Sequence, residues 1–287
     1  MALIDLKGMG IALVTPFKAD GSVDYEALVK LVEYQVQNGT DYLVVLGTTA
    51  ETPTLTETEK AEIKRLVVTQ VRRRVPVVLG VGGNCTRAVV DTLRQADLQD
   101  VDAILSVVPY YNKPSQEGIF RHYEAIAEAT TRPVILYNVP GRTETTLRLA
   151  RTFRNIVAVK EASGNIKQMN DIIKNKPADF QVISGDDGIT YPLIALGAVG
   201  VISVIGNAFP REFSRMVRLA LEGDYDNARV IHSRFMELFD LLFVDGNPAG
   251  VKSMLNMMGF IENRLRLPLV PTRLTTYEKI REILNRL

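Results

Sequence analysis

The chain has 287 residues, of which 46% are hydrophobic and 23% charged, as in an ordinary globular protein. A formal net charge of +1 provides no broad electrostatic field, so we expect neither a nucleic-acid nor a membrane partner. The single cysteine, Cys85, allows no intrachain disulfide, and the two histidines are not in a metal-ligand spacing. The N-terminus lacks a signal-peptide pattern, and no apolar run reaches the roughly 20 residues that span a bilayer, so we expect a cytoplasmic protein.

Eight short runs rich in β-branched residues recur along the chain, each followed by a stretch with helical periodicity. The runs are 11–15, 42–46, 76–81, 103–108, 134–139, 156–160, 181–184 and 199–203. Strands that are apolar on both faces and separated by helices indicate a parallel sheet covered by helices. Eight such units favour an α/β fold that closes as a (β/α)₈ TIM barrel over an open sheet.

Local signals place the helices between these runs and indicate where the barrel ends. Asp24 can cap the first helix, and Thr56 with Glu59 forms a capping box for the next. After residue 223 the strand pattern stops, and only helical stretches interrupted by prolines follow. We assign 1–223 to the barrel and 224–287 to a C-terminal helical region.

In such barrels the reactive side chains lie at the carboxyl ends of the strands. The second run leads into 47–51, where the hydroxyls of Thr48 and Thr49 and free backbone N–H groups suit a carboxylate; a turn that caps the next helix is the simpler alternative. The fourth run leads to Tyr110 and Tyr111 between prolines, which indicates an interface or the rim of an active site.

The fifth and sixth runs end in groups that can carry proton transfer and nucleophilic attack. Tyr137 can move protons, or make an ordinary hydrogen bond, and Arg142 can hold a carboxylate bidentately, or simply be solvated. Lys160 ends the sixth run, on the predicted face of Ile156 and Ala158. Its amine can form a Schiff base with a carbonyl compound; the alternative is a lysine that ion-pairs at the rim.

Two aspartates follow the seventh run. Asp186 and Asp187 have no third carboxylate or histidine at a matching spacing, so we predict no metal site. Capping of the next helix is the better interpretation of both.

In their order and spacing, these motifs are similar to those of the dihydrodipicolinate synthase family, within the pyruvate-dependent Schiff-base aldolases and lyases. The motifs are VTPF (14–17), GTTAETPTL (47–55), PYYNKPSQEG (109–118), YNVPGRT (137–143), VKEASGN (159–165), SGDD (184–187), GVISV (200–204) and NPAGVK (247–252). The resemblance implies condensation of pyruvate with L-aspartate-4-semialdehyde in diaminopimelate and lysine biosynthesis. It implies no cofactor, because the iminium itself withdraws the electrons.

The resemblance also implies residue roles. Lys160 matches the imine-forming lysine, and a proton-relay triad matches Tyr137, Thr49 and Tyr111, the last reaching in from a neighbouring subunit of a dimer of dimers. Thr48 and Thr49 match the pair that holds the pyruvate carboxylate, and Arg142 matches the arginine that binds the semialdehyde carboxylate. Further pocket positions match Gly185, Asp186 and Ile202.

Two features depart from the family pattern or from its lysine-inhibited members. Position 50 is alanine where most members have glycine, so the loop must hold a conformation open to an L-residue. Asn84 and Tyr110 match positions of a regulatory lysine site, but Ala88 and Lys60 replace a glutamate and a histidine there. We expect weak or absent inhibition by L-lysine, because the counter-charge for the ligand's ammonium groups is missing.

Two alternatives compete with this interpretation. The first is a sister enzyme with a polyol substrate, such as N-acetylneuraminate lyase or a 2-keto-3-deoxy sugar acid aldolase, which lacks the counterpart of Arg142. The second is a non-catalytic barrel that binds a keto acid, which needs the carboxylate loop but not the pair Lys160 and Tyr137.

Overall fold

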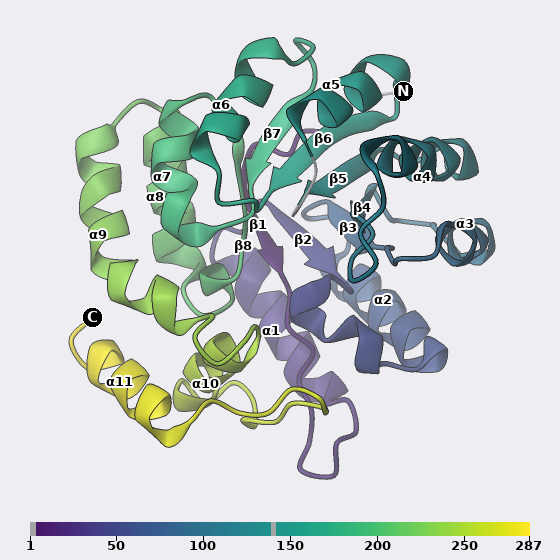
Figure 1. The fold of residues 1–287 in the computed structure, drawn as a ribbon. Coiled ribbons are helices and arrows are strands. Elements are labelled where there is room, and N and C mark those ends of the chain that lie inside the picture. Colours follow the sequence, from purple (N-terminus) through teal and green to yellow (C-terminus); the bar gives the residue numbers. More distant parts are fainter. Residues whose placement is uncertain (1–3, 139–141) are drawn as a thin grey trace.

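The computed structural model describes residues 4–138 and 142–287. Residues 139–141 lie outside them; all three belong to the YNVPGRT motif, and residue 139 is the last of the predicted fifth strand. Eight parallel strands close into a barrel in which each strand pairs with the next and β8 pairs with β1 (Figure 1). The strands are β1 (Gly8–Ala12), β2 (Tyr42–Val45), β3 (Val77–Gly80), β4 (Ala103–Val107), β5 (Val134–Asn138), β6 (Ile156–Glu161), β7 (Gln181–Ser184) and β8 (Gly200–Ser203).

Helices alternate with the strands and surround the barrel, and three more helices follow the last unit at one side of it (Figure 1). The helices of the barrel are α1 (Tyr25–Gln37), α2 (Glu57–Val71), α3 (Thr86–Gln95), α4 (Gln116–Ala129), α5 (Thr143–Thr152), α6 (Ile166–Asn175), α7 (Asp187–Ala195) and α8 (Pro210–Leu221). The helices that follow are α9 (Tyr225–Leu241), α10 (Ala249–Met257) and α11 (Leu274–Leu284). The predicted TIM barrel with a C-terminal helical region is confirmed.

The helix starts follow from local capping. The Asp24 side chain accepts a hydrogen bond from the backbone N–H of Ala27 at 3.0 Å, and Thr56 with Glu59 forms the predicted reciprocal capping box. Both devices satisfy N–H groups that the first turn of a helix leaves without partners.

The first strand is the one whose position differs from the prediction: it covers Gly8–Ala12 rather than 11–15. Glycine is a poor strand former by itself, so the apolar pattern drew the prediction toward Val14. A Cβ atom at Gly10 would lie 2.1 Å from the ring of Tyr42, so glycine leaves room for that ring inside the barrel. Val14 has left the sheet, and its N–H donates to Asn207 Oδ1 at 3.2 Å.

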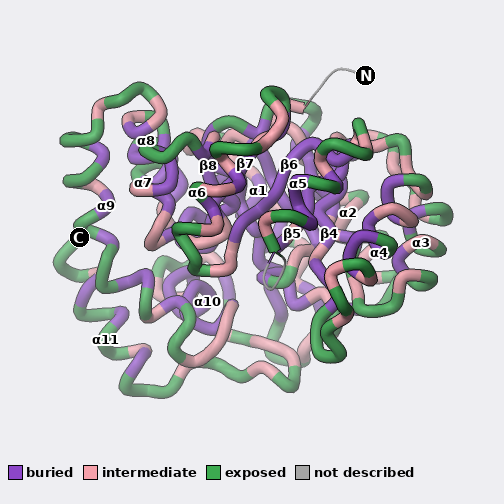
Figure 2. Tube along the Cα trace, turned by 45° about the horizontal axis from the view of Figure 1, so that its top comes forward, coloured by how far each residue is buried: buried purple, intermediate pink, exposed green. Residues whose placement is uncertain are grey.

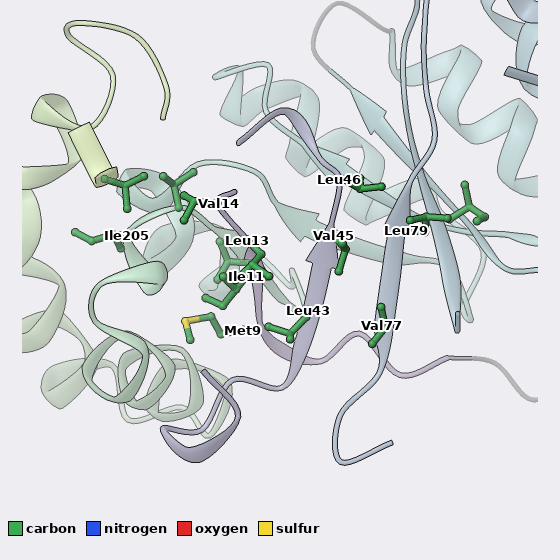
Figure 3. Packing of buried hydrophobic residues seen from close by; sticks show 14 of the residues in the cluster. Met9, Ile11, Leu13, Val14, Leu43, Val45, Leu46, Val77, Leu79 and Ile205 are labelled. Atoms are coloured by element: carbon green, nitrogen blue, oxygen red, sulfur yellow. The ribbon is translucent and has the colours of Figure 1, made fainter. Parts of the chain in front are cut away.

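Two apolar layers lie on the two faces of the sheet, whose strands are mostly buried (Figure 2). Figure 3 shows alternate side chains of three strands in the outer layer, between the sheet and the helices: Met9, Ile11, Leu43, Val45, Val77 and Leu79. A second cluster, which includes Ala12, Val44 and Ile135, fills the barrel interior. Each fully buried Leu, Ile or Val contributes about 1.5–3 kcal/mol, so the two layers carry most of the stability of the barrel.

An irregularity in β6 changes which residues face the interior. The register with β5 passes from Val134 opposite Ile156 to Ile135 opposite Ala158, which skips one residue of β6. Ile156 therefore packs in the outer layer, while Ala158 packs in the interior. The prediction that Ile156 shares a face of the strand with Ala158 and Lys160 is therefore wrong, because a bulge interrupts the alternation of side chains between the two faces.

Candidate active site

Lys160 and Tyr137 lie side by side where β6 and β5 end. The two residues are partners in the register of the neighbouring strands, and Lys160 Nζ lies 4.3 Å from the centroid of the Tyr137 ring. Only 6% of the lysine is exposed, and Tyr137 packs on the interior cluster. The arrangement brings a buried amine and a phenol together at one end of the barrel.

Gly185 makes room for the lysine stem. A Cβ atom at this position would lie 3.1 Å from Lys160 Cε and 2.7 Å from Ala162 Cβ. The backbone N–H of Gly185 donates to the carbonyl of Glu161 at 2.6 Å. A side chain here would clash first with Ala162 Cβ and with the Glu161 carbonyl at 2.9 Å, so glycine is required by packing.

On the opposite face of β6, the side chain of Glu161 is fully buried. Asn138 Nδ2 donates to its Oε1 at 2.5 Å and Ser163 Oγ to its Oε2 at 2.9 Å. Burial raises the pKa of Glu161. The motif VKEASGN contains this residue, but sequence reasoning assigned it no role; its burial beside Lys160 becomes visible only in the fold.

The predicted carboxylate loop is a short 3₁₀ turn, Thr48–Ala50, directly after β2. Thr49 is buried and Thr48 is exposed. The left-handed residue of the turn is Glu51, with φ of 55°, and Ala50 keeps an ordinary negative φ. The alanine is therefore compatible with the loop, as the sequence required. Thr15 Oγ1 donates to the Ala50 carbonyl at 2.8 Å and holds the turn against the segment after β1.

A buried ion pair fastens this loop to the C-terminal region. Lys252 Nζ donates to Glu51 Oε1 at 2.5 Å and to the Arg264 carbonyl at 2.9 Å, and it lies 4.2 Å from the centroid of the Phe17 ring. Glu51 Oε2 accepts from the Arg266 N–H at 2.9 Å. Burial lowers the pKa of Lys252 to about 8, although Glu51 works in the opposite direction. The NPAGVK motif pointed to this segment, but the pairing itself was not predicted.

The aspartates after β7 have two different roles. Asp186 Oδ1 accepts from the Gly188 N–H at 2.8 Å and caps α7, as predicted. Asp187 does not cap that helix: its Oδ2 accepts from the N–H groups of Val204 and Ile205 at 3.0 and 2.8 Å, and so holds the turn after β8. Burial raises the pKa of Asp187 to about 6. Ile202, on β8 just before that turn, is buried in the barrel interior.

The remaining predicted site residues lie on the surface of the single chain. Arg142 is exposed just before α5, where its backbone N–H donates to Gln116 Oε1 at 3.2 Å. Tyr111 is 92% exposed and has a left-handed φ of 64°, so its ring does not pack against Lys160 within one chain. Tyr110 and Asn84 of the expected regulatory site are also exposed.

The described residues provide neither a metal-binding cluster nor a helix that could cross a membrane. Residues 4–138 and 142–287 contain no group of three histidine, cysteine, aspartate or glutamate side chains placed to hold a metal ion. In the same part of the chain, no helix combines the length and the apolar character that crossing a membrane requires.

The site is a buried lysine beside a tyrosine at the strand ends of a closed parallel barrel, and the relatives of the chain make it a barrel enzyme of the lyase class. The chain belongs to the dihydrodipicolinate synthetase family, whose model matches residues 5–287. The 4-hydroxy-tetrahydrodipicolinate synthase of Parabacteroides distasonis is 77% identical over 293 residues, covering 100% of this chain and 99% of that protein.

Solved structures of the family agree with this assignment. The crystal structure of dihydrodipicolinate synthase from Aquifex aeolicus matches with a TM-score of 0.94 and 42% identity, over 98% of each chain. A structure described as the first monomeric dihydrodipicolinate synthase variant matches with a TM-score of 0.94 and 40% identity, over 97% of this chain and 96% of that one.

Proposed function

We propose that this chain condenses pyruvate with L-aspartate-4-semialdehyde, the reaction of 4-hydroxy-tetrahydrodipicolinate synthase, and that Lys160 carries pyruvate as a Schiff base. The observation that carries the proposal is the buried Lys160 amine 4.3 Å from the Tyr137 ring at the ends of adjacent strands. The name of the relative at 77% identity supports the same reaction and gives no support to a polyol-cleaving sister enzyme or a sensor.

The chemistry begins when the Lys160 amine adds to C2 of pyruvate and water leaves. The protonated imine withdraws electrons, so C3 loses a proton and becomes an enamine carbon. This carbon forms a bond to the aldehyde carbon of the second substrate. The amine of the product then displaces Lys160 and the ring closes, which returns the free lysine. We assign the proton transfers at the imine nitrogen to the phenol hydroxyl of Tyr137, the residue whose ring lies beside the amine.

The substrate carboxylates need donors on both sides of this reaction centre. For pyruvate we assign the hydroxyls of Thr48 and Thr49 and the N–H groups of their turn, and for the semialdehyde we assign Arg142. Gly185, Asp186 and Ile202 complete the wall of the pocket, Gly185 through its packing on the lysine stem.

Tyr111 joins the relay only if another subunit presents it, because it is 92% exposed in its own chain. We therefore propose that the active enzyme is a homo-oligomer, a dimer of dimers, in which the two subunits of each dimer share Tyr111. We also place the enzyme in the cytoplasm, where its one cysteine stays reduced.

Borohydride reduction with intact-mass analysis tests the proposal. Pyruvate plus borohydride should add one reduced pyruvoyl group, and peptide mapping should place it on Lys160. Lys160→Ala should abolish both the adduct and turnover, whereas Lys174→Ala, at an exposed position of α6, should keep both. Near-normal turnover by Lys160→Ala would refute the mechanism.

A further inference from the structure

Asn247 contacts the proposed pyruvate-binding loop from outside the barrel. It lies just before α10, and its side-chain Nδ2 donates a hydrogen bond to Thr49 Oγ1 at 2.9 Å. The two residues are 198 positions apart in the chain, so only the tertiary fold brings them together. We propose that Asn247 is a positioning residue that orients the Thr49 hydroxyl as a donor toward the pyruvate carboxylate; this inference rests on the proposed function.

The argument starts from the hydrogen-bonding inventory of a threonine hydroxyl, which has one proton to donate and two lone pairs. The amide of Asn247 occupies a lone pair of Oγ1, so the hydroxyl proton is directed elsewhere. A carboxylate is an acceptor without protons, and it binds to groups that present N–H or O–H to it. The contact therefore sets the hydroxyl in the orientation that an anionic substrate needs.

The amide itself is held in place by the anchoring of its segment. Lys252, five residues later, is fully buried and paired with Glu51, which directly follows the turn that contains Thr49. The loop and the segment before α10 are thus joined at two points, Thr49 with Asn247 and Glu51 with Lys252. Because the ion pair joins the same two segments, it keeps the segment before α10 close to the loop.

The other half of the amide argues against a purely structural role. Asn247 Oδ1 is buried and has no hydrogen-bond partner among the described residues, 4–138 and 142–287. Leaving a buried acceptor unpaired is unfavourable, and such groups concentrate where a site needs them for chemistry.

The inference also separates two roles of Thr49. As a member of a proton relay, Thr49 must accept and donate protons during turnover, so its loss should lower kcat. As an oriented donor to the carboxylate, it should govern the pyruvate concentration at which the imine forms. The contact with Asn247 predicts the second effect.

The test measures imine formation by borohydride trapping and intact mass over a range of pyruvate concentrations, without the second substrate. Asn247→Ala should raise the half-saturating pyruvate concentration about 3- to 10-fold, the loss expected for one oriented hydrogen bond. Asn247→Asp should raise it further, because a carboxylate cannot donate to Thr49 and repels the pyruvate carboxylate. Tight pyruvate binding by Asn247→Asp would overturn the proposal, since it would mean that Thr49 donates to residue 247.

A double-mutant cycle isolates the path of the effect. In a Thr49→Val background, Asn247→Ala should change the half-saturating concentration by less than about twofold, because the oriented hydroxyl is already absent. An undiminished effect in that background would overturn the proposal. Asn256→Ala is the matched control: Asn256 Nδ2 donates to the Ile261 carbonyl within the same C-terminal region, away from the loop, and its loss should leave trapping unchanged.

The proposed function fails separately from this inference. If the unaltered protein forms no adduct at any pyruvate concentration, the Schiff-base mechanism is wrong. If it forms the adduct and Asn247→Ala forms it with the same concentration dependence, only the positioning role is wrong.

Discussion

Replacement of Lys252 by methionine tests how the C-terminal region stabilises the carboxylate loop. The ammonium and Glu51 are both 0% exposed, and the pair is made at 2.5 Å. In Lys252→Met, Glu51 Oε1 loses its partner and keeps a buried negative charge, while Oε2 retains the Arg266 N–H. Removing one partner of such a pair costs about 3–5 kcal/mol, mostly as the penalty of the charge left behind.

That cost is large enough to measure in a chain of this size. At about 2.1 cal/mol/K per residue, the unfolding entropy of 287 residues is about 0.6 kcal/mol/K, so the Tm should fall by about 5–8 °C. Differential scanning calorimetry and urea unfolding at one fixed protein concentration measure the loss. Lys279 is exposed on α11, so Lys279→Met is the matched control and should change the free energy of unfolding by less than about 0.5 kcal/mol.

A second substitution decides whether the buried charge is the cause. In Glu51→Gln with Lys252→Met, no charge remains unpaired, and a side-chain carbonyl can still accept from the Arg266 N–H. Most of the lost stability should return. A double variant as unstable as Lys252→Met alone would refute the reasoning, because the cost would then come from packing against Phe17 rather than from Glu51.

The other predictions concern substrate, pH, assembly and regulation. Arg142→Ala should raise the KM for aspartate-4-semialdehyde by the equivalent of about 1.5–3 kcal/mol and leave pyruvate trapping intact; equal damage to both substrates would contradict its role. The folded pKa of Asp187, about 6, lies above its unfolded value of 3.8, so its contribution to stability is fully present below about pH 4 and declines as pH rises through 6. Urea unfolding at several pH values in this range should show the free energy of unfolding declining by about 3 kcal/mol, and the decline should be absent in Asp187→Asn. The same pH dependence in Asp187→Asn as in the unaltered protein would contradict this assignment to Asp187. If Tyr111 acts in the neighbouring subunit, activity should be lost at the falling protein concentrations at which sedimentation shows the oligomer dissociating. A fully active monomer would exclude the sharing of Tyr111 between subunits. L-lysine should inhibit weakly or not at all, because Ala88 supplies no counter-charge and Glu57 is already paired with Lys60 at 2.7 Å; strong inhibition below millimolar lysine would be the contrary result.

Much of the fold was predictable because its signals are local. The period of the apolar runs identified eight strand–helix units, and Thr56 with Glu59 marked the start of a helix by chemistry within four residues. The barrel rule then places Lys160, Tyr137 and the threonine loop at strand ends from the sequence alone. Motif order across the whole chain identified the family correctly.

The tertiary structure decided what depends on contacts between distant segments. The bulge that turns Ile156 outward arises from the register between β5 and β6, which a period of two cannot reveal. Gly10 belongs to a strand because the ring of Tyr42 needs its space, although the propensity of glycine opposes it. The contact of Asn247 with Thr49 joins residues 198 positions apart. It could not be predicted from the sequence, because side-chain packing and buried polar pairing act through space and leave no periodic trace there.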